Sequence, residues 1–532
     1  MNKKAFINGK IYTVNPQNPQ AESVVVHDKR IIFAGSGHNA KRLIDKETEV
    51  IDLRKRLMLP GFIDSHTHFI RGGFHLQSIN LHNANSEEEF RFLIKKHLKE
   101  NPDKWITGGY WDNERWGKNT LPTKELIDNI TTNIPVFVER FDEHTGLANS
   151  LALKLAGITK NTESPEGGLI EKDNRTGEPT GILKDNAMTL IYKIIPPHSD
   201  EEIYKASLTA LDEAAKNGIT SIHDITYPRD LSAFQNLERD NKLTIRIYTR
   251  LPISTYHNLI DEGIAYNFGS YKLKIGSLKA FADGSLGSGT AWFFEPYLLE
   301  PDNYGLSTDI VQNGSLERWG LEADKNNLQL SVHAIGDKAN WYVLDIFERI
   351  AKTNAKWDRR FRIEHAQHLR SEDIPKFKEH NVIASCQPYH AIDDGVWAEK
   401  KIGHNRIKTT YTFKSLLDTG AKVCFGSDWP VAPLNALYGI YAATTRITLD
   451  GKNLDGWIPE QKISIEQAIK CYTIDAAYAG YQENQIGSIE PGKFADLIIL
   501  DHDILSIAPE EIKDVQVDTT IFDGQIIYDS KG

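Results

Sequence analysis

Two histidines stand one residue apart in the segment LPGFIDSHTHFI, residues 59–70. Side chains alternate between the two faces of a strand, so His66 and His68 share one face of a strand that ends here. Two imidazoles side by side at a strand end can form half of a metal site. The pair alone is weak evidence, because histidines also serve as ordinary hydrogen-bonded or exposed residues.

Four more polar residues stand at or near the carboxyl ends of separate predicted strands. They are Lys279 in SLKAFADG, His333 in SVHAIGD, His365 in IEHAQ and Asp428 in FGSDWP. Barrel enzymes assemble their active sites at that edge. Structural alternatives exist for each: His333 and His365 as core histidines, Asp428 as a cap before Pro430, and Lys279 as a partner of Asp283. Their joint appearance at successive strand ends favours one shared site.

The elements that carry these residues follow a regular order. From residue 218 onward, short apolar strands alternate with helical stretches, and seven strands can be read there: ITSIHD, TIRIYTR, KIGSLKAFADG, LQLSVHAIGD, FRIEHA, VIASCQP and KVCFGSD. With LMLPGFIDSHTH they make eight, the number in a (β/α)8 TIM-like barrel of the α/β class. A doubly wound sheet is the competing fold, less favoured because polar strand ends recur around so many strands.

Both chain ends have a different pattern. Residues 5–57 alternate apolar and polar positions, and the C-terminal segments ADLIILD and TTIFDGQIIYD repeat this style. Neither end has enough strands to close a core alone, so we expect them to meet in one small β domain. Residues 81–204 form an insertion that is rich in predicted helix, with the aromatic segment GGYWDNERWG and the predicted hairpin GGLIEKDNRTGEPTG.

Composition excludes several classes of function. The chain has 532 residues, 40% hydrophobic and 25% charged, and no stretch approaches the roughly 18 consecutive apolar residues of a membrane helix. The net charge of −11 comes without a basic patch, which argues against a nucleic-acid partner. Three scattered cysteines suit a reducing compartment, and the N-terminus lacks the apolar core of a signal peptide, so we expect a cytoplasmic protein.

The sequence resembles the amidohydrolase superfamily (amidohydrolase family 3), and within it the YtcJ-like, N-substituted-formamide-deformylase-like branch. The motifs that carry the resemblance span nearly the whole chain: LPGFIDSHTH, GGYWDNERWG, FDEHTGLANS, GITSIHD, KAFADGSLGSGTAWFFEPY, VHAIGDKA, RIEHAQ, FGSDWPV and IGSIEPGKFADLIILD. The resemblance implies a β-sandwich made by both termini (1–57 and 485–532), a first barrel strand in 58–80, a lid-like α+β insertion (81–204) and a metal-bearing barrel (205–484).

The resemblance also implies roles for the candidate residues. His66 and His68 correspond to ligands of the more buried metal, and His333 and His365 to ligands of a second. Lys279 corresponds to a carboxylated lysine that bridges the two metals, and Asp428 to a ligand that is also the catalytic proton shuttle. Zinc is the expected metal. If Lys279 is unmodified, a one-metal site of His66, His68, a later histidine and Asp428 remains open.

The surroundings of Lys279 agree with that role. Leu278, Ala280 and Phe281 flank the amine, and poor solvation lowers the pKa of a lysine, which supplies the neutral nucleophile that reacts with carbon dioxide.

Substrate contacts are expected from the insertion. Trp111 is the aromatic residue we expect in the substrate pocket, with ordinary core packing as its alternative. His144 in DEHTGLANS is the second expected contact, with a capping or core role as its alternative. His223 and Asp224 end an early strand and are expected only to support the metal ligands.

The expected function is a metal-dependent hydrolase that uses metal-activated water to cleave a non-peptide C–N bond, amide or formamide-like, in a small-molecule substrate. A metal-dependent isomerase or other non-hydrolytic enzyme on the same barrel is the alternative. A binding protein without activity is less favoured, because every expected ligand position is filled. No G-x-S-x-G elbow or cysteine nucleophile signature occurs. The number of subunits stays open, with a homodimer compatible.

Overall fold

The computed structural model describes residues 3–82, 84–100, 105–116, 120–140, 145–165 and 167–531. The chain divides into two compact units. The first unit comprises residues 1–70 and 210–532, and the second comprises residues 71–209. None of the helices in the described ranges is long and apolar enough to cross a membrane.

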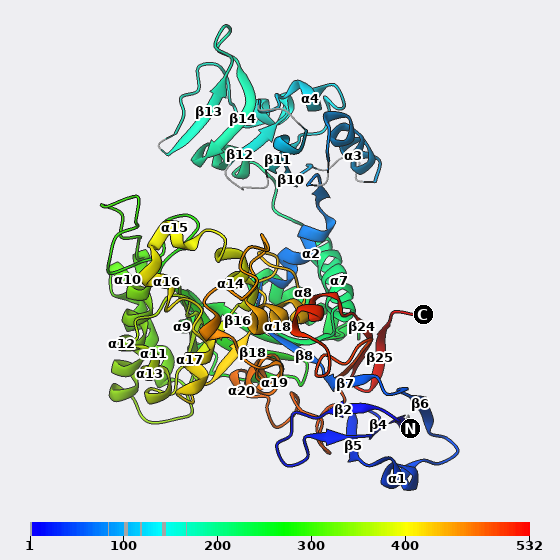
Figure 1. Cartoon of the computed structure of the whole chain (residues 1–532). Coiled ribbons are helices and arrows are strands. Elements are labelled where there is room, and N and C mark those ends of the chain that lie inside the picture. The colour runs from blue at the N-terminus through cyan, green and yellow to red at the C-terminus, as the bar shows by residue number, and fades with distance from the viewer. Residues whose placement is uncertain are drawn as a thin grey trace. The chain divides into compact units, whose positions relative to one another are not determined.

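The centre of the first unit is the predicted barrel (Figure 1). Its eight parallel strands are β8 (Phe62–Thr67), β15 (Ile219–Ile225), β16 (Arg246–Pro252), β18 (Leu273–Phe281), β19 (Gln329–Ala334), β20 (Arg362–His365), β21 (Ile383–Cys386) and β22 (Val423–Phe425). Each pairs with the next in this order. The last strand meets the first at their carboxyl ends, where His68 N donates to Trp429 O at 2.8 Å and Asp428 N to His66 O at 2.7 Å. The (β/α)8 prediction is confirmed.

Helices surround the strands of the barrel (Figure 1). They include α8 (Pro228–Arg239), α9 (Tyr256–Asp261), α11 (Ser315–Lys325), α12 (Asp337–Thr353), α13 (Ile374–Glu379), α17 (Phe413–Asp418) and α18 (Ala436–Thr445). In α12, Val343, Phe347 and Ile350 are buried at spacings of three to four residues, so the helix presents one apolar face to the sheet. The connection from β21 to β22 begins with the short helix α14 (Pro388–Asp394).

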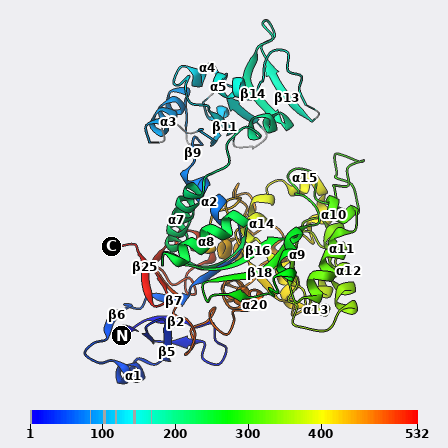
Figure 2. The same cartoon turned by 180° about the vertical axis from the view of Figure 1, so that it is seen from behind.

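The two chain ends form a β-sandwich, and their strands lie side by side in both views (Figures 1 and 2). One sheet has the order β5 (Arg30–Gly35), β4 (Ser23–His27), β1 (Lys3–Ile7) and β6 (Glu49–Asp52). The other has the order β25 (Gln525–Asp529), β24 (Val517–Phe522), β23 (Leu497–Leu500), β7 (Leu57–Pro60), β2 (Lys10–Tyr12) and β3 (Gln20–Ala21). Phe6, Val24, Met58, Leu497 and Ile521 share its core, so both termini are needed.

The predicted strand LMLPGFIDSHTH is two strands. Leu57–Pro60 pairs with β23 in the sandwich, and the barrel strand begins after Gly61. A Cβ at Gly61 would lie 2.2 Å from Thr220 Oγ1, so glycine permits this close passage beside β15. The sandwich therefore reaches three residues further than the sequence indicated.

The second unit contains a six-stranded sheet and several helices. Its strand order is β13 (Gly168–Lys172), β14 (Pro179–Asp185), β12 (Thr145–Ala148), β11 (Phe137–Arg140), β10 (Gly108–Trp111) and β9 (Ile79–Asn80). Its helices include α3 (Glu87–Glu100), α4 (Glu125–Asp128), α5 (Ser150–Leu155) and α6 (Thr189–Tyr192). The predicted hairpin is β13–β14, which pair antiparallel. This unit, residues 71–209, contains the expected α+β insertion, which the sequence predicts over 81–204.

Candidate functional site

His66, His68 and Asp428 come together where the barrel closes. Asp428 Oδ1 lies 3.4 Å from His66 Nε2 and 3.3 Å from His68 Nε2. One ligand atom from each residue lies within 4.8 Å of the others. The hydrogen bonds between the ends of β8 and β22 produce this arrangement, because they hold the backbone of Asp428 beside that of His66.

His333 and His365 extend the same group. The ring centroid of His365 lies 5.0 Å from that of His66 and 4.5 Å from that of His333. His365 and Asp428 both have left-handed backbones, with φ of 72° and 64°. Such angles are uncommon for residues other than glycine and cluster at functional sites, since the surrounding structure must stabilise them. Five of the six predicted ligands are thus brought to one edge.

Lys279, the sixth, is 3% exposed and inside the barrel. Its Nζ has no hydrogen-bond partner among the residues that the structure describes, and it lies 4.7 Å from the Phe281 ring centroid. Burial lowers the pKa of Lys279 to about 7. Asp283, the alternative partner, instead accepts hydrogen bonds from the backbone N–H groups of Ile335 and Gly336. Such an amine loses its proton easily. It can then bind a metal directly or react with carbon dioxide to form a carbamate ligand.

The protonation states of the ligand set suit a divalent cation. Burial lowers the pKa of His66 to about 3, that of His333 to about 4 and that of His365 well below its usual range. Burial would raise the pKa of Asp428, but His66, His68 and His365 hold it well below its usual range. Neutral imidazoles beside an ionised carboxylate are the donors that zinc prefers. The residues present therefore fit the implied metal.

The family model described as "Amidohydrolase family" matches residues 49–528, most of the chain. The chain belongs to the amidohydrolase family. It is 39% identical over 93% of its length to Protein LONG AFTER FAR-RED 3 of Arabidopsis thaliana, of which 86% is covered. It is 32% identical to a Bacillus subtilis (strain 168) protein named YtcJ, with 99% of each chain covered.

Two further similar proteins have an enzymatic activity in their names. An N-substituted formamide deformylase of Arthrobacter pascens is 26% identical over 99% of this amidohydrolase and 98% of its own length. A solved structure titled as an uncharacterized metal-dependent hydrolase from Pyrococcus horikoshii OT3 has a TM-score of 0.80 and 30% identity, and covers 96% of this chain and 99% of its own. The predicted resemblance is confirmed.

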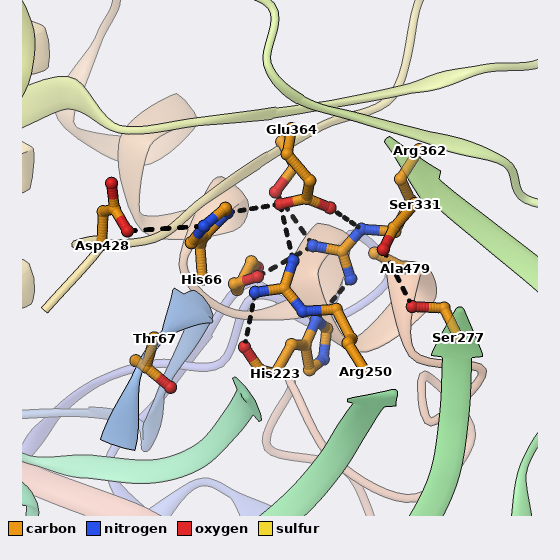
Figure 3. Close-up of polar contacts among 12 residues, drawn as sticks. His66, Thr67, His223, Arg250, Ser277, Ser331, Arg362, Glu364, Asp428 and Ala479 are labelled. Atoms are coloured by element: carbon orange, nitrogen blue, oxygen red, sulfur yellow. Dashed lines mark hydrogen bonds and ion pairs between the residues drawn. The ribbon is translucent and has the colours of Figure 1, made fainter. Parts of the chain in front are cut away.

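The site of this amidohydrolase contains two residues that the sequence reasoning missed. Glu364 Oε2 lies 2.5 Å from His66 Nδ1, on the opposite side of the ring from Asp428 (Figure 3). His390, on α14, has a buried Nε2 with no hydrogen-bond partner in the described part of the chain, 3.9 Å from Asp428 Oδ2. The available signals were the glutamate directly before His365 and a histidine soon after the seventh strand, in QPYH.

Two buried aspartates accept hydrogen bonds from the backbone that carries the predicted ligands. Asp64 Oδ1 accepts from the backbone N–H of His66 at 3.0 Å and from that of Ser427 at 2.9 Å, which joins the ends of β8 and β22. Asp224 Oδ1 accepts from Phe69 N at 2.7 Å, directly after His68. Burial raises the pKa of Asp64 to about 6 and that of Asp224 to about 7. Asp224 therefore supports the ligand segment, as expected for it.

Trp111, one of the two predicted substrate contacts, lies in the second unit. Trp111 is 0% exposed, and its Nε1 donates to Val138 O at 2.9 Å within the core of that unit. This position favours packing, the alternative given for Trp111 above. His144 lies outside the described residues.

Proposed function

We propose that this protein is a metal-dependent hydrolase that cleaves a non-peptide C–N bond, amide or formamide-like, in a small-molecule substrate. The observation that carries the proposal is the convergence of His66, His68 and Asp428 at the carboxyl edge of the closed barrel. The name of the Arthrobacter pascens relative supports the choice of bond.

His66, His68 and Asp428 would hold one divalent ion, with zinc as the first choice. Lys279, His333 and His365 would hold a second if Lys279 is carboxylated. A bound ion of this kind lowers the pKa of water towards neutrality and polarises a carbonyl group. Of these six residues only His68 is partly exposed and the other five are buried, which limits competing solvent around the reacting groups.

Asp428 is the proposed proton carrier of the reaction. Its carboxylate takes one proton from the attacking water and delivers it to the leaving nitrogen, so that the carbonyl carbon gains the hydroxyl and the amine gains the proton. His390 Nε2 lies 3.9 Å from Asp428 Oδ2 and has no hydrogen-bond partner among the described residues, so it is placed to donate a hydrogen bond to a substrate oxygen at the same edge. The products are a carboxylic acid and an amine, or formate and an amine from a formamide.

The test combines metal analysis with a substrate screen. We expect the purified protein to contain zinc, and a panel of N-substituted formamides and small amides hydrolysed in ¹⁸O-labelled water to give labelled carboxylate. Asp428→Asn should lower kcat by at least about 10²-fold, the scale of a lost general acid–base group. Asp418→Asn is the matched control, because Asp418 is 57% exposed and pairs with Lys414 on the surface.

The proposal fails if the protein binds no divalent metal, or if Asp428→Asn retains full activity. Turnover of a substrate without incorporation of the label would instead support the isomerase or another non-hydrolytic reaction.

A further inference from the structure

The interior of the barrel directly beneath His66 is charged. Arg250 on β16 and Arg362 and Glu364 on β20 are each 0% exposed, and we call these three residues the Arg–Glu–Arg cluster (Figure 3). The interior layers of (β/α)8 barrels are usually filled by Val, Ile and Leu. Burying three charges is costly, and well-packed apolar residues are often at least as stable. Stability alone therefore does not explain this cluster.

One carboxylate joins the cluster to the metal site. Glu364 Oε2 lies 2.5 Å from His66 Nδ1 and 2.7 Å from Arg250 Nη1. Glu364 Oε1 lies 2.9 Å from Arg362 Nε. Both oxygens thus take part in close ion pairs, and among the predicted ligands in the described residues only His66 lies within hydrogen-bond distance of this carboxylate.

The guanidinium groups are fixed by other strands of the barrel. Arg250 Nη2 donates to His223 O on β15 at 3.0 Å. Arg362 Nη2 donates to Ser65 O on β8 at 2.8 Å and to Ser385 Oγ on β21 at 2.9 Å. β8 also carries His66. Arg362 therefore contacts both the strand that bears His66 and Glu364, whose carboxylate contacts the His66 ring. Glu364 consequently has little freedom to move relative to His66.

The charge of Glu364 determines which nitrogen of His66 is available. Two guanidinium groups face this carboxyl group, with Arg250 Nη1 2.7 Å from Oε2 and Arg362 Nε 2.9 Å from Oε1, which favours the ionised carboxylate. A carboxylate only accepts hydrogen bonds, so the neutral imidazole donates from Nδ1 and keeps its lone pair on Nε2. That Nε2 is the atom 3.4 Å from Asp428 Oδ1, on the side of the ring that faces the other predicted ligand.

We propose that Glu364, held by Arg250 and Arg362, is a positioning residue that fixes the tautomer and ring direction of His66 for metal binding. This inference rests on the proposed function, because it requires a metal at His66. It goes beyond that function in assigning the buried charges of the barrel interior a role in metal affinity.

A second buried ion pair provides a matched control. Arg246, at the amino end of the same strand β16, pairs with Asp496 at 2.7 Å and with Asp523 at 2.5 Å. Its side chain is 1% exposed and that of Asp496 is 4% exposed, so this pair is buried almost as fully as the cluster. It contacts none of the predicted ligands among the described residues. Asp496→Asn therefore removes a buried carboxylate from an arginine without touching the site.

The experiment measures the zinc dissociation constant of the full chain, stripped of metal, by competition with a chromophoric chelator. Glu364→Gln should raise the dissociation constant about 10- to 100-fold, the range found when a carboxylate behind a histidine ligand is removed. Asp496→Asn should leave it within about twofold of the wild-type value. Saturating zinc should restore most of the kcat of Glu364→Gln, because the ligands themselves remain.

If Glu364→Gln does not fold, Glu364→Gln with Arg250→Met preserves the net charge of the cluster and takes its place. The inference is overturned if the folded variant binds zinc as tightly as the wild type, or if Asp496→Asn weakens binding equally. Absence of zinc binding by the wild type would overturn the proposed function. Tight wild-type binding with no effect at Glu364 would overturn only this inference.

Discussion

The ring contacts of His66 and His368 distinguish a candidate metal ligand from a structural histidine. His66 has a carboxylate on either side of its ring. His368, three residues after His365, has its Nδ1 2.8 Å from Thr410 Oγ1 and its Nε2 3.2 Å from the side-chain amide of Gln367. His368 is thus a hydrogen-bonded core histidine.

His368 makes stability depend on pH. Burial lowers the pKa of His368 to about 3, whereas a histidine in an unfolded chain titrates near 6.5. As the pH falls from about 6.5 towards about 3, the unfolded chain binds a proton that the folded chain does not. The free energy of unfolding therefore falls over this window, by up to about 1.4 kcal/mol per pH unit from this one group, and its contribution is complete above pH 6.5.

His368→Gln should reduce the slope of the free energy of unfolding against pH by up to about one bound proton between pH 6.5 and 5. Urea unfolding at several pH values measures this slope. His404→Gln on α16 (His404–Ile407), where the side chain is 70% exposed, is the control and should leave the slope unchanged. Equal slopes for His368→Gln and the wild type would contradict the assignment.

At the scale of elements, strand ends were predictable and interior contacts were not. Apolar segments that alternate with helical stretches predict eight strands. They also place Lys279, His333 and Asp428 at one edge, because parallel strands all end on the same side. Glu364 could not be placed, since its partner Arg250 is more than a hundred residues distant and comes close only through the strand register around the barrel. His390 lies on a helix, outside the strand pattern that located the others.

Gly426, just after β22, tests how closely two elements must approach to form the site. A Cβ there would lie 2.4 Å from His66 N and 2.8 Å from Asp64 Oδ1, so Gly426→Ala would push β22 away from β8. We expect the free energy of unfolding to fall by about 1–3 kcal/mol, as for other overpacked sites. Zinc affinity should fall roughly tenfold or more, because His66 and Asp428 lie on the separated ends.

Gly37→Ala is the control for that substitution, because its Cβ would meet nothing closer than Glu22 Oε2 at 3.5 Å. It should leave both the unfolding curve and the chelator competition close to wild type. Unchanged zinc binding in Gly426→Ala would show that the spacing of β8 and β22 does not determine metal affinity.

At the scale of the molecule, buried ion pairs join the sandwich to the barrel, in addition to the chain connections between them. Arg246, in the first position of β16, contacts Asp496 just before β23 and Asp523 just after β24. The guanidinium carbon also lies 3.8 Å from the Phe494 ring centroid. The amino end of the barrel is thus bound to the strands of the C-terminal chain, so the sandwich and the barrel should lose structure together.

Asp496→Asn tests this coupling. Removing one partner of a buried ion pair typically costs about 3–5 kcal/mol, and here we expect the lower end, about 3 kcal/mol, because Asp523 still faces Arg246. If the two parts unfold as one unit, native-state hydrogen exchange should show an equal loss of protection in β23 of the sandwich and in β20 of the barrel. A loss confined to β23 and β24 would mean that the sandwich opens separately and that Arg246 stabilises only the strands it contacts.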